Sequence, residues 1–182
     1  IDVEEGLEEE YTLGSDNAHD ILYEQHNPDY IPTDQGGPAV LVADSENNRI
    51  VEYQRSGGKW NRTWLYTDRQ MEWPRDADRL PNGNTLITDT HSSRVFEVNR
   101  SGGVVWTLHF PKGYEAERLG TGDESAGGSS ASELGLQSVS EGGIEEAEVS
   151  GRRPILGIVY GVIRSLLPNK IYHGLTVVAP PW

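Results

Sequence analysis

An internal repeat constrains the fold of this chain more than any other feature. Residues 41–58 (LVADSENNRIVEYQRSGG) align with residues 86–103 (LITDTHSSRVFEVNRSGG) at an offset of 45 residues, and eight of the aligned positions are identical. In each copy, short runs of β-branched and apolar residues alternate with Asn, Asp, Ser and Gly, a pattern typical of antiparallel strands joined by tight turns. A period of about 45 residues with four strands per unit is that of a β-propeller blade.

The second copy predicts where strands and turns fall. We expect strands at residues 85–88, 94–98 and 104–108, separated by polar turns. In the first unit we expect a strand at residues 19–25 and a closing strand at residues 11–13.

A charged lead-in precedes each unit. DADRL at residues 76–80 returns as EAERL at residues 115–119, and HNPDYI at residues 26–31 is a looser copy. The chain is therefore expected to contain repeat 1 at residues 11–66, repeat 2 at residues 67–110 and the start of a third repeat at residues 111–123.

The segments that flank the repeats have a different character. Residues 1–10 form an acidic lead, and residues 124–150, rich in Gly, Ser and Glu, predict a disordered linker because they offer little apolar area to bury. Residues 151–182 are apolar, with helical spacing up to Pro168. The apolar run is shorter than the roughly 20 residues that span a bilayer. The helix could cap a sheet edge or lie at a membrane interface, and we favour membrane proximity for residues 154–182.

The charge balance is strongly acidic. The chain has 29 acidic and 15 basic residues, a net charge of −14 and only three lysines. Nucleic acids and anionic membranes attract basic surfaces, so neither is expected as the main partner. An acidic, lysine-poor surface suits concentrated salt, where the screening length falls to roughly 3 Å at 1 M. We therefore expect a halophilic source, with an ordinary acidic protein as the alternative.

Cysteine is absent, which excludes disulfides and thiolate metal sites. Two Asn-x-Ser/Thr tripeptides begin at Asn61 and Asn99, beside predicted turns. Both asparagines are candidate glycosylation sites if the chain is exported.

The repeat resembles two known families. Residues 42–53 (VADSENNRIVEY) are similar to the NHL repeat of β-propellers. Residues 76–87 (DADRLPNGNTLI), with Glu97, Val105 and Trp106, resemble the arylsulfotransferase propeller family, and more narrowly its haloarchaeal, membrane-anchored members.

This resemblance covers residues 11–123 and implies an all-β fold. We expect a partial β-propeller of about two and a half four-stranded antiparallel blades, followed by the linker and the apolar C-terminal helix. A complete ring needs roughly six blades, so the rest of a larger propeller or another chain is expected to close it. The expected location is the cell surface, outside the cytoplasm and at the membrane.

The family also implies a reaction and a candidate nucleophile. Its members transfer a sulfuryl group between phenols through a histidine near the propeller axis, so the expected partner is an aryl sulfate or a phenol. A neutral imidazole attacks sulfur well, and cationic groups hold the sulfonate oxygens. The family lead-in carries His-His-Asp or His-Asp, and here only the first copy keeps a histidine, His26. The alternatives are a non-enzymatic NHL-like binding propeller and a structural envelope protein that needs no pocket.

Charged residues of the lead-ins are the other candidate ligands. Substrate or ion binding at one end of the axis is assigned to Asp29, Asp76, Asp78, Arg79 and Arg118. Asp76 and Asp78 could also hold a hard cation such as calcium, although no cofactor is firmly implied. The simpler alternative is that Asp78 pairs with the adjacent Arg79.

The remaining candidates have structural interpretations. The recurring pairs Asp44 with Arg49 and Asp89 with Arg94 are expected to stabilise matching turns. His91 lies in an outer turn and is expected to be solvated. The tryptophans of the repeats are expected in the core between blades, at Trp60, Trp64, Trp73 and Trp106.

Overall fold

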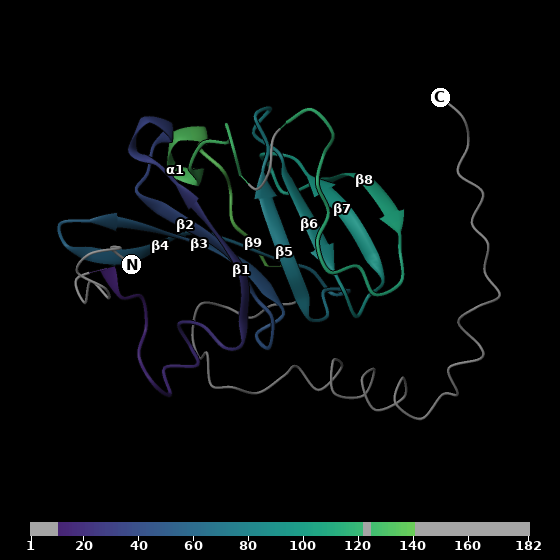
Figure 1. Cartoon of the computed structure of the whole chain (residues 1–182), viewed down its shortest axis with the longest axis horizontal. Helices are drawn as coiled ribbons and strands as arrows, with labels where there is room; N and C mark the ends of the chain where they lie inside the picture. Colours follow the sequence, from purple (N-terminus) through teal and green to yellow (C-terminus); the bar gives the residue numbers. More distant parts are fainter. Residues whose placement is uncertain (1–10, 122–124, 141–182) are drawn as a thin grey trace.

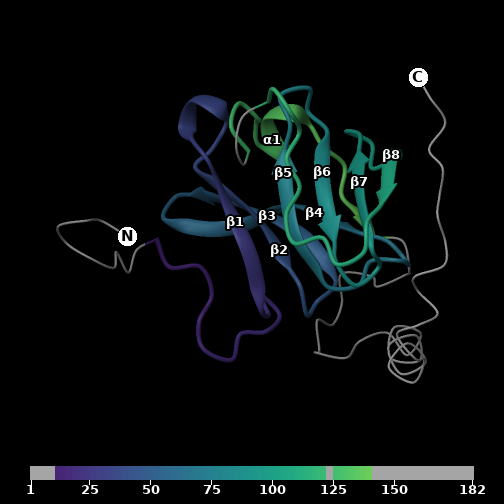
Figure 2. The same cartoon turned by 45° about the vertical axis from the view of Figure 1, so that its right-hand side comes forward.

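The computed structural model describes residues 11–121 and 125–140, which form two β-sheets lying side by side (Figures 1 and 2). Sheet 1 contains, in spatial order, β1 (Gln25–Ile31), β2 (Ala39–Asp44), β3 (Arg49–Ser56), β4 (Lys59–Thr67) and the short β9 (Val139–Ser140). Sheet 2 contains β5 (Pro74–Arg79), β6 (Thr85–Asp89), β7 (Arg94–Val98) and β8 (Val104–His109). Two short helices, η2 (Thr33–Gln35) and α1 (Ala131–Leu134), complete the described elements, so the fold is mostly β.

The two sheets repeat one another in strand order and register. The first four strands of each are antiparallel, and the β2–β3 ladder matches the β6–β7 ladder over the shared positions. Asp44 stands opposite Arg49 at the turn of one sheet, as Asp89 stands opposite Arg94 in the other. The prediction that the sequence repeats fold as successive four-stranded antiparallel sheets is confirmed.

The backbone conformation also repeats, and this repetition extends beyond the two sheets to the third lead-in. Asn48 and Ser93, at matching places in the two turns, have φ values of 52° and 55°. Glu24 before β1, Trp73 before β5 and Lys112 before the third lead-in have φ values of 49°, 55° and 58°. Residues other than glycine rarely adopt this left-handed conformation. The same conformation therefore recurs before each of the three lead-ins, although residues 111–121 contain no strand.

The main apolar core lies between the two sheets. Trp64 and Tyr66 of β4 meet Ile87 and Phe96 of sheet 2, and all four side chains are buried. The rings of Trp64, Tyr66 and Phe96 follow one another with centroid separations of 6.2 and 5.9 Å. Because successive strand residues point to opposite faces, each sheet also has a second apolar face that needs cover.

The N-terminal segment covers the second face of sheet 1 without forming the strands expected there. Residues 19–21 form a turn, β1 begins only at Gln25 and residues 11–13 form no strand, so the strands predicted at 19–25 and 11–13 are wrong. Leu13, Ile21 and Leu22 pack against β2 and β3 instead, and the Tyr53 hydroxyl donates to the Ile21 carbonyl at 2.9 Å. Their apolar residues serve as loop packing, which a short hydrophobic run does not distinguish from a strand.

Residues 125–140, which we call the strap, contact both sheets, so the prediction of a disordered linker is wrong for this part of residues 124–150. The Ala131 amide donates to both oxygens of the Glu52 carboxylate at 2.8 and 3.0 Å. The Trp64 indole donates to the Gln137 carbonyl at 3.1 Å, and β9 pairs in parallel with β4 through Val139. The composition argument fails because the strap uses the apolar surface and hydrogen-bonding groups of the sheets instead of a core of its own.

The outer strands of the two sheets differ in exposure. Trp64 of β4 and Trp106 of β8 hold matching positions, opposite Glu52 and Glu97. Trp64 is 2% exposed because sheet 2 and the strap cover it, whereas Trp106 is 43% exposed. The prediction of a core role therefore holds for Trp64 and is wrong for Trp106. All six residues of β8 are exposed, so this apolar strand forms one open surface of the described molecule.

This difference gives a matched pair of substitutions. Trp64→Ala should lower the free energy of unfolding by about 3–5 kcal/mol, because it opens a cavity between the sheets. Trp106→Ala should cost no more than about 1 kcal/mol, because its ring is already half solvated. Urea denaturation of both variants at one salt concentration measures the two values. Equal losses would contradict the assignment of Trp64 alone to the core between the sheets.

The acidic lead at 1–10, residues 141–150 of the expected linker and the apolar segment at 151–182 lie outside the described residues. Within residues 11–121 and 125–140, no helix has the length and hydropathy required to cross a bilayer.

Candidate functional site

Each of the two matching turns makes one hydrogen bond to the segment that follows its sheet in the chain. The Ser45 hydroxyl, in the β2–β3 turn, donates to the Pro74 carbonyl at 2.6 Å. The Thr90 hydroxyl, at the matching place in the β6–β7 turn, donates to the Gly113 carbonyl at 2.7 Å. Pro74 opens the second unit and Gly113 the third, so the same contact is made twice along the chain.

Two ion pairs repeat in the same way. Arg79 of β5 reaches back to Glu52 of β3 at 2.9 Å, and Arg118 of the third lead-in reaches back to Glu97 of β7. The expected pairing of Asp78 with its neighbour Arg79 is therefore wrong. Arg79 is fully buried, and its other donor group reaches Thr85 at 2.9 Å. Its guanidinium is closed to any substrate, and Arg79 and Arg118 are placed as links between units.

His26 lies near the start of β1, at the end of the molecule where these turns gather. Its Nδ1 atom lies 2.7 Å from the Ser45 hydroxyl and 3.0 Å from the Glu24 carbonyl. Its ring meets the Trp73 ring edge-on, with 5.2 Å between centroids. The β1 strand and the β2–β3 turn position His26 together, while Trp73 comes from the entry to sheet 2.

Trp73 brings together residues that the sequence places far apart. His91, in the β6–β7 turn, stacks on the Trp73 ring at 4.6 Å between centroids and 18° between planes. His91 is exposed, as expected, but it is not remote from His26, because both rings contact Trp73. The Trp73 ring thus contacts both histidines and is only partly buried, so the prediction that it lies in the core is wrong.

Arg75 adds a cation to this cluster. Its guanidinium carbon lies 4.4 Å from the centroid of the Trp73 ring and 4.4 Å from that of Tyr114. Such cation–π contacts hold a guanidinium by its faces and leave the N–H edge for other partners. Among residues 11–121 and 125–140, Arg75 has no ion pair, and its Nε atom has no hydrogen-bond acceptor.

The sequence held a signal for Arg75. When the lead-in alignment is extended by one residue toward the N-terminus, His26, Arg75 and Tyr114 occupy one place, which is also two residues after the repeated left-handed conformation. At this equivalent position the three lead-ins carry an imidazole (His26), a guanidinium (Arg75) and a phenol (Tyr114). We refer to His26, Trp73, Arg75, His91 and Tyr114 as the entry cluster.

A second group of polar residues is buried on the inner strands. Asp29 of β1 and Asp78 of β5 are 3% and 1% exposed and hold matching positions, opposite Leu41 and Leu86. The Ser125 hydroxyl of the strap donates to Asp29 and accepts from the Arg79 amide at 2.8 Å.

The neighbouring Asp76 is partly satisfied. It accepts hydrogen bonds from the Asn27 side chain at 3.2 Å and the Ala116 amide at 3.3 Å. Asp76 therefore joins the first unit to the third lead-in, where Glu115 and Glu117 follow.

Burial changes the protonation of these carboxyl groups. Desolvation, with the charges of Asp76, Asp29 and Glu117, raises the pKa of Asp78 to about 9, and Asp29 is hydrogen-bonded to it. Desolvation also raises the pKa of Asp76 to about 6, against the hydrogen bonds from Ala116 and Asn27. Two ionised carboxylates repel and cannot donate to each other, so we expect Asp78 and Asp29 to share one proton at neutral pH.

The acidic residues do not assemble a metal site. Among the described residues there is no group of three or more His, Cys, Asp or Glu side chains placed to hold a metal ion. Asp76 and Asp78 belong to no such group among the described residues, so the geometry gives the calcium hypothesis no support.

The turn pairs are formed as predicted. Arg49 contacts Asp44 at 2.6 Å and Arg94 contacts Asp89 at 3.0 Å, with both carboxylates fully buried. Each aspartate also accepts the amide of the segment entering its unit, from Tyr23 at 2.6 Å and from Glu72 at 3.0 Å. These pairs are structural.

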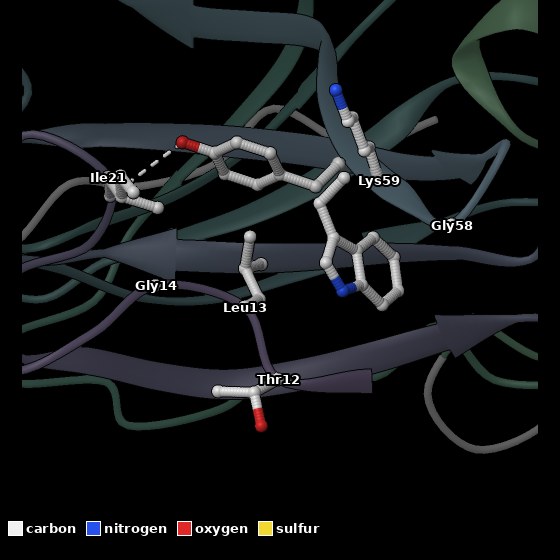
Figure 3. Close-up of a pocket in the computed structure, with 8 residues that line it drawn as sticks. Thr12, Leu13, Gly14, Ile21, Gly58 and Lys59 are labelled. Atoms are coloured by element: carbon white, nitrogen blue, oxygen red, sulfur yellow. Dashed lines mark hydrogen bonds between the residues drawn. The ribbon is translucent and has the colours of Figure 1, made fainter. Parts of the chain in front are cut away.

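The remaining candidates lie away from the entry cluster. Asn61 is exposed on β4, and the Asn99 side-chain oxygen accepts from Ser101 and Gly103 within the β7–β8 turn. An open groove of about 460 Å³ lies on the outer side of sheet 1, where Thr12, Leu13 and Ile21 face Trp60 and Lys59 (Figure 3). No residue of the entry cluster lines this groove.

The shared proton predicts how stability depends on pH. The folded state holds the Asp78 proton up to a pH of about 9, whereas an unfolded aspartate loses it near a pH of about 4. The free energy of unfolding should therefore fall as the pH rises through this window, by on the order of 1 kcal/mol per pH unit. Asp78→Asn should flatten the profile, as measured by urea denaturation at several pH values in constant salt.

Asp76→Asn is the control for this prediction. Asp76 titrates lower, and its charge is one of those that raise the pKa of Asp78. Asp76→Asn should therefore keep the downward slope but end it below a pH of about 9, whereas Asp78→Asn should remove it. A steep profile that survives Asp78→Asn would assign the titration to another group.

Comparison with known proteins adds no assignment. No protein-family model matches the chain, and no curated protein matches its sequence.

Proposed function

We propose that this chain is part of a β-propeller that binds an aryl sulfate at the entry cluster and transfers its sulfuryl group through His26. The two sheets supply two blades, and residues 111–121 supply the first part of a third. The observation that carries the proposal is the arrangement around Trp73, where one imidazole and one cation without an anionic partner meet a single ring.

Each part of an aryl sulfate has a counterpart in the entry cluster. The exposed Tyr114 ring offers a stacking surface for the aryl group, while the Trp73 ring, already covered by His91 and Arg75, holds the cluster together. The guanidinium edge of Arg75 offers paired N–H donors, a geometry that suits the oxygens of a sulfate or sulfonate. His26 has one ring nitrogen engaged inside the protein and Nε2 left for the substrate.

The reaction needs no cofactor. The Nε2 lone pair attacks sulfur, the S–O bond to the phenol breaks and the phenolate leaves. The sulfuryl group on Nε2 then passes to the oxygen of a second phenol, which restores the imidazole and gives up its proton to water. Arg75 stabilises the charge on the sulfonate oxygens in both steps.

Substitution of the two histidines tests the proposal. With a nitrophenyl sulfate as donor and a phenol as acceptor, His26→Gln should lower the release of nitrophenolate by about 10³-fold or more, because it removes the nucleophile. His91→Gln should stay within about twofold, because the His91 imidazole forms no bond to sulfur in the proposed reaction. Transfer that survives His26→Gln would move the nucleophile elsewhere in the intact protein.

The alternative is a binding propeller without catalysis. It is favoured by the carboxyl groups of Asp29, Asp76 and Asp78, which make the inner strands acidic where a transferase would profit from further cations. Calorimetric titration with a nitrophenyl sulfate separates the two functions. Binding that disappears in Arg75→Gln, without any transfer in the unsubstituted chain, would establish the binding module.

We also propose that a further blade covers the open surface of β8. Trp106 and Leu108 match Trp64 and Tyr66, which sheet 2 covers in the first unit. The contacts of Gly113 and Arg118 with the β6–β7 turn and β7 support this proposal, because they repeat the contacts that Pro74 and Arg79 make with sheet 1. The proposed cover is the rest of a third blade, from the same protein or another chain.

The proposed location is the extracytoplasmic surface of a halophile. The net charge of −14 and the exposed Asn61 sequon support it. Export should show as a glycan on Asn61 by mass spectrometry of protein purified from its natural host.

A further inference from the structure

The hydrogen bonds of Ser45 determine the tautomer of the His26 imidazole, on which the proposed reaction depends. A serine hydroxyl has one proton to donate and can accept through its lone pairs. Ser45 lies 2.6 Å from the Pro74 carbonyl, which can only accept, so the hydroxyl proton points to Pro74. Toward His26, at 2.7 Å, the same hydroxyl must act as an acceptor.

The imidazole must therefore carry a proton on Nδ1. The Glu24 carbonyl, 3.0 Å from the same nitrogen, also accepts and can never donate. In a neutral imidazole only one ring nitrogen is protonated, so the proton on Nδ1 leaves the lone pair on Nε2. The hydrogen bonds on one side of the ring thus decide which nitrogen acts on the other side.

The second unit shows that this arrangement is specific to His26. Thr90 matches Ser45 and makes the same bond to a carbonyl of the next unit, at Gly113. The residue that corresponds to His26 in that unit is Arg75, which makes no hydrogen bond to Thr90 among the described contacts. Ser45 therefore combines a structural bond that both units need with a second bond that only His26 uses.

We propose that Ser45 is a positioning residue that holds His26 in the Nδ1-protonated tautomer and so presents the Nε2 lone pair as the nucleophile. The inference rests on the proposed function for its catalytic meaning. The tautomer itself can be measured without any activity.

Nitrogen-15 NMR of the full chain at alkaline pH, where imidazole is neutral, provides the test. In the unsubstituted protein, His26 should show a pyrrole-type signal for Nδ1 and a pyridine-type signal for Nε2. Ser45→Ala should shift both signals toward the mixture of tautomers found in a free imidazole. Ser45→Thr should keep the original signals, because its hydroxyl can make both bonds.

Thr90→Ala is the matched control. It removes the same kind of bond between units, so it should lower the free energy of unfolding about as much as Ser45→Ala does. It should leave the His26 signals and the transfer rate unchanged. Ser45→Ala should lower kcat about tenfold or more while KM stays within about twofold, since Ser45 does not contact the substrate.

Each outcome is decisive. A protonated Nε2 in the unsubstituted protein, or His26 signals that ignore Ser45→Ala, would overturn the inference. The expected tautomers without any sulfuryl transfer would overturn the proposed function and leave the assignment of Ser45 to the tautomer intact.

Discussion

The contact between Glu52 and Arg79 is the one on which the rest of the structure depends. Both side chains are completely buried between the sheets, where further hydrogen bonds to the paired groups offset the cost of removing the charges from water. Burial raises the pKa of Glu52 and lowers that of Arg79 to about 10, which shows how much desolvation the pair must offset. The strap supplies the compensation, because the Ala131 amide donates to both oxygens of Glu52. Strap, sheet 1 and sheet 2 are thus joined at one carboxylate.

The sequence predicted the parts of the fold that are local and repeated. Eight identities at one offset located the ladders β2–β3 and β6–β7, and the pairs Asp44 with Arg49 and Asp89 with Arg94 lie in matching turns as expected. Turns and alternation act over a few residues, so one sequence suffices to find them. The partners of Arg79 and Arg118 lie in the preceding unit, and adjacency in the sequence suggested the wrong acids.

The strap and the entry cluster were missed for different physical reasons. Composition describes whether a segment can make its own core, and the strap makes none; it borrows Trp64 and Glu52 from sheet 1. The entry cluster was missed because Trp73, Arg75 and His91 differ in type from their counterparts in the first unit. Residues that are identical in the two copies are those that stabilise the sheets. A search for identity therefore overlooks positions at which the copies differ.

This difference between the copies separates two kinds of position, those that stabilise the fold and those whose side chains can vary. The left-handed residues before each inner strand and the hydroxyls at Ser45 and Thr90 fix the same frame in successive units. On this frame the place two residues further on holds His26, Arg75 or Tyr114, and none of the repeated contacts depends on which side chain stands there. Neighbouring units therefore direct three different functional groups to one end of the molecule. The spacing of those groups follows from the packing of the two sheets against each other, to which the buried pair Glu52–Arg79 contributes.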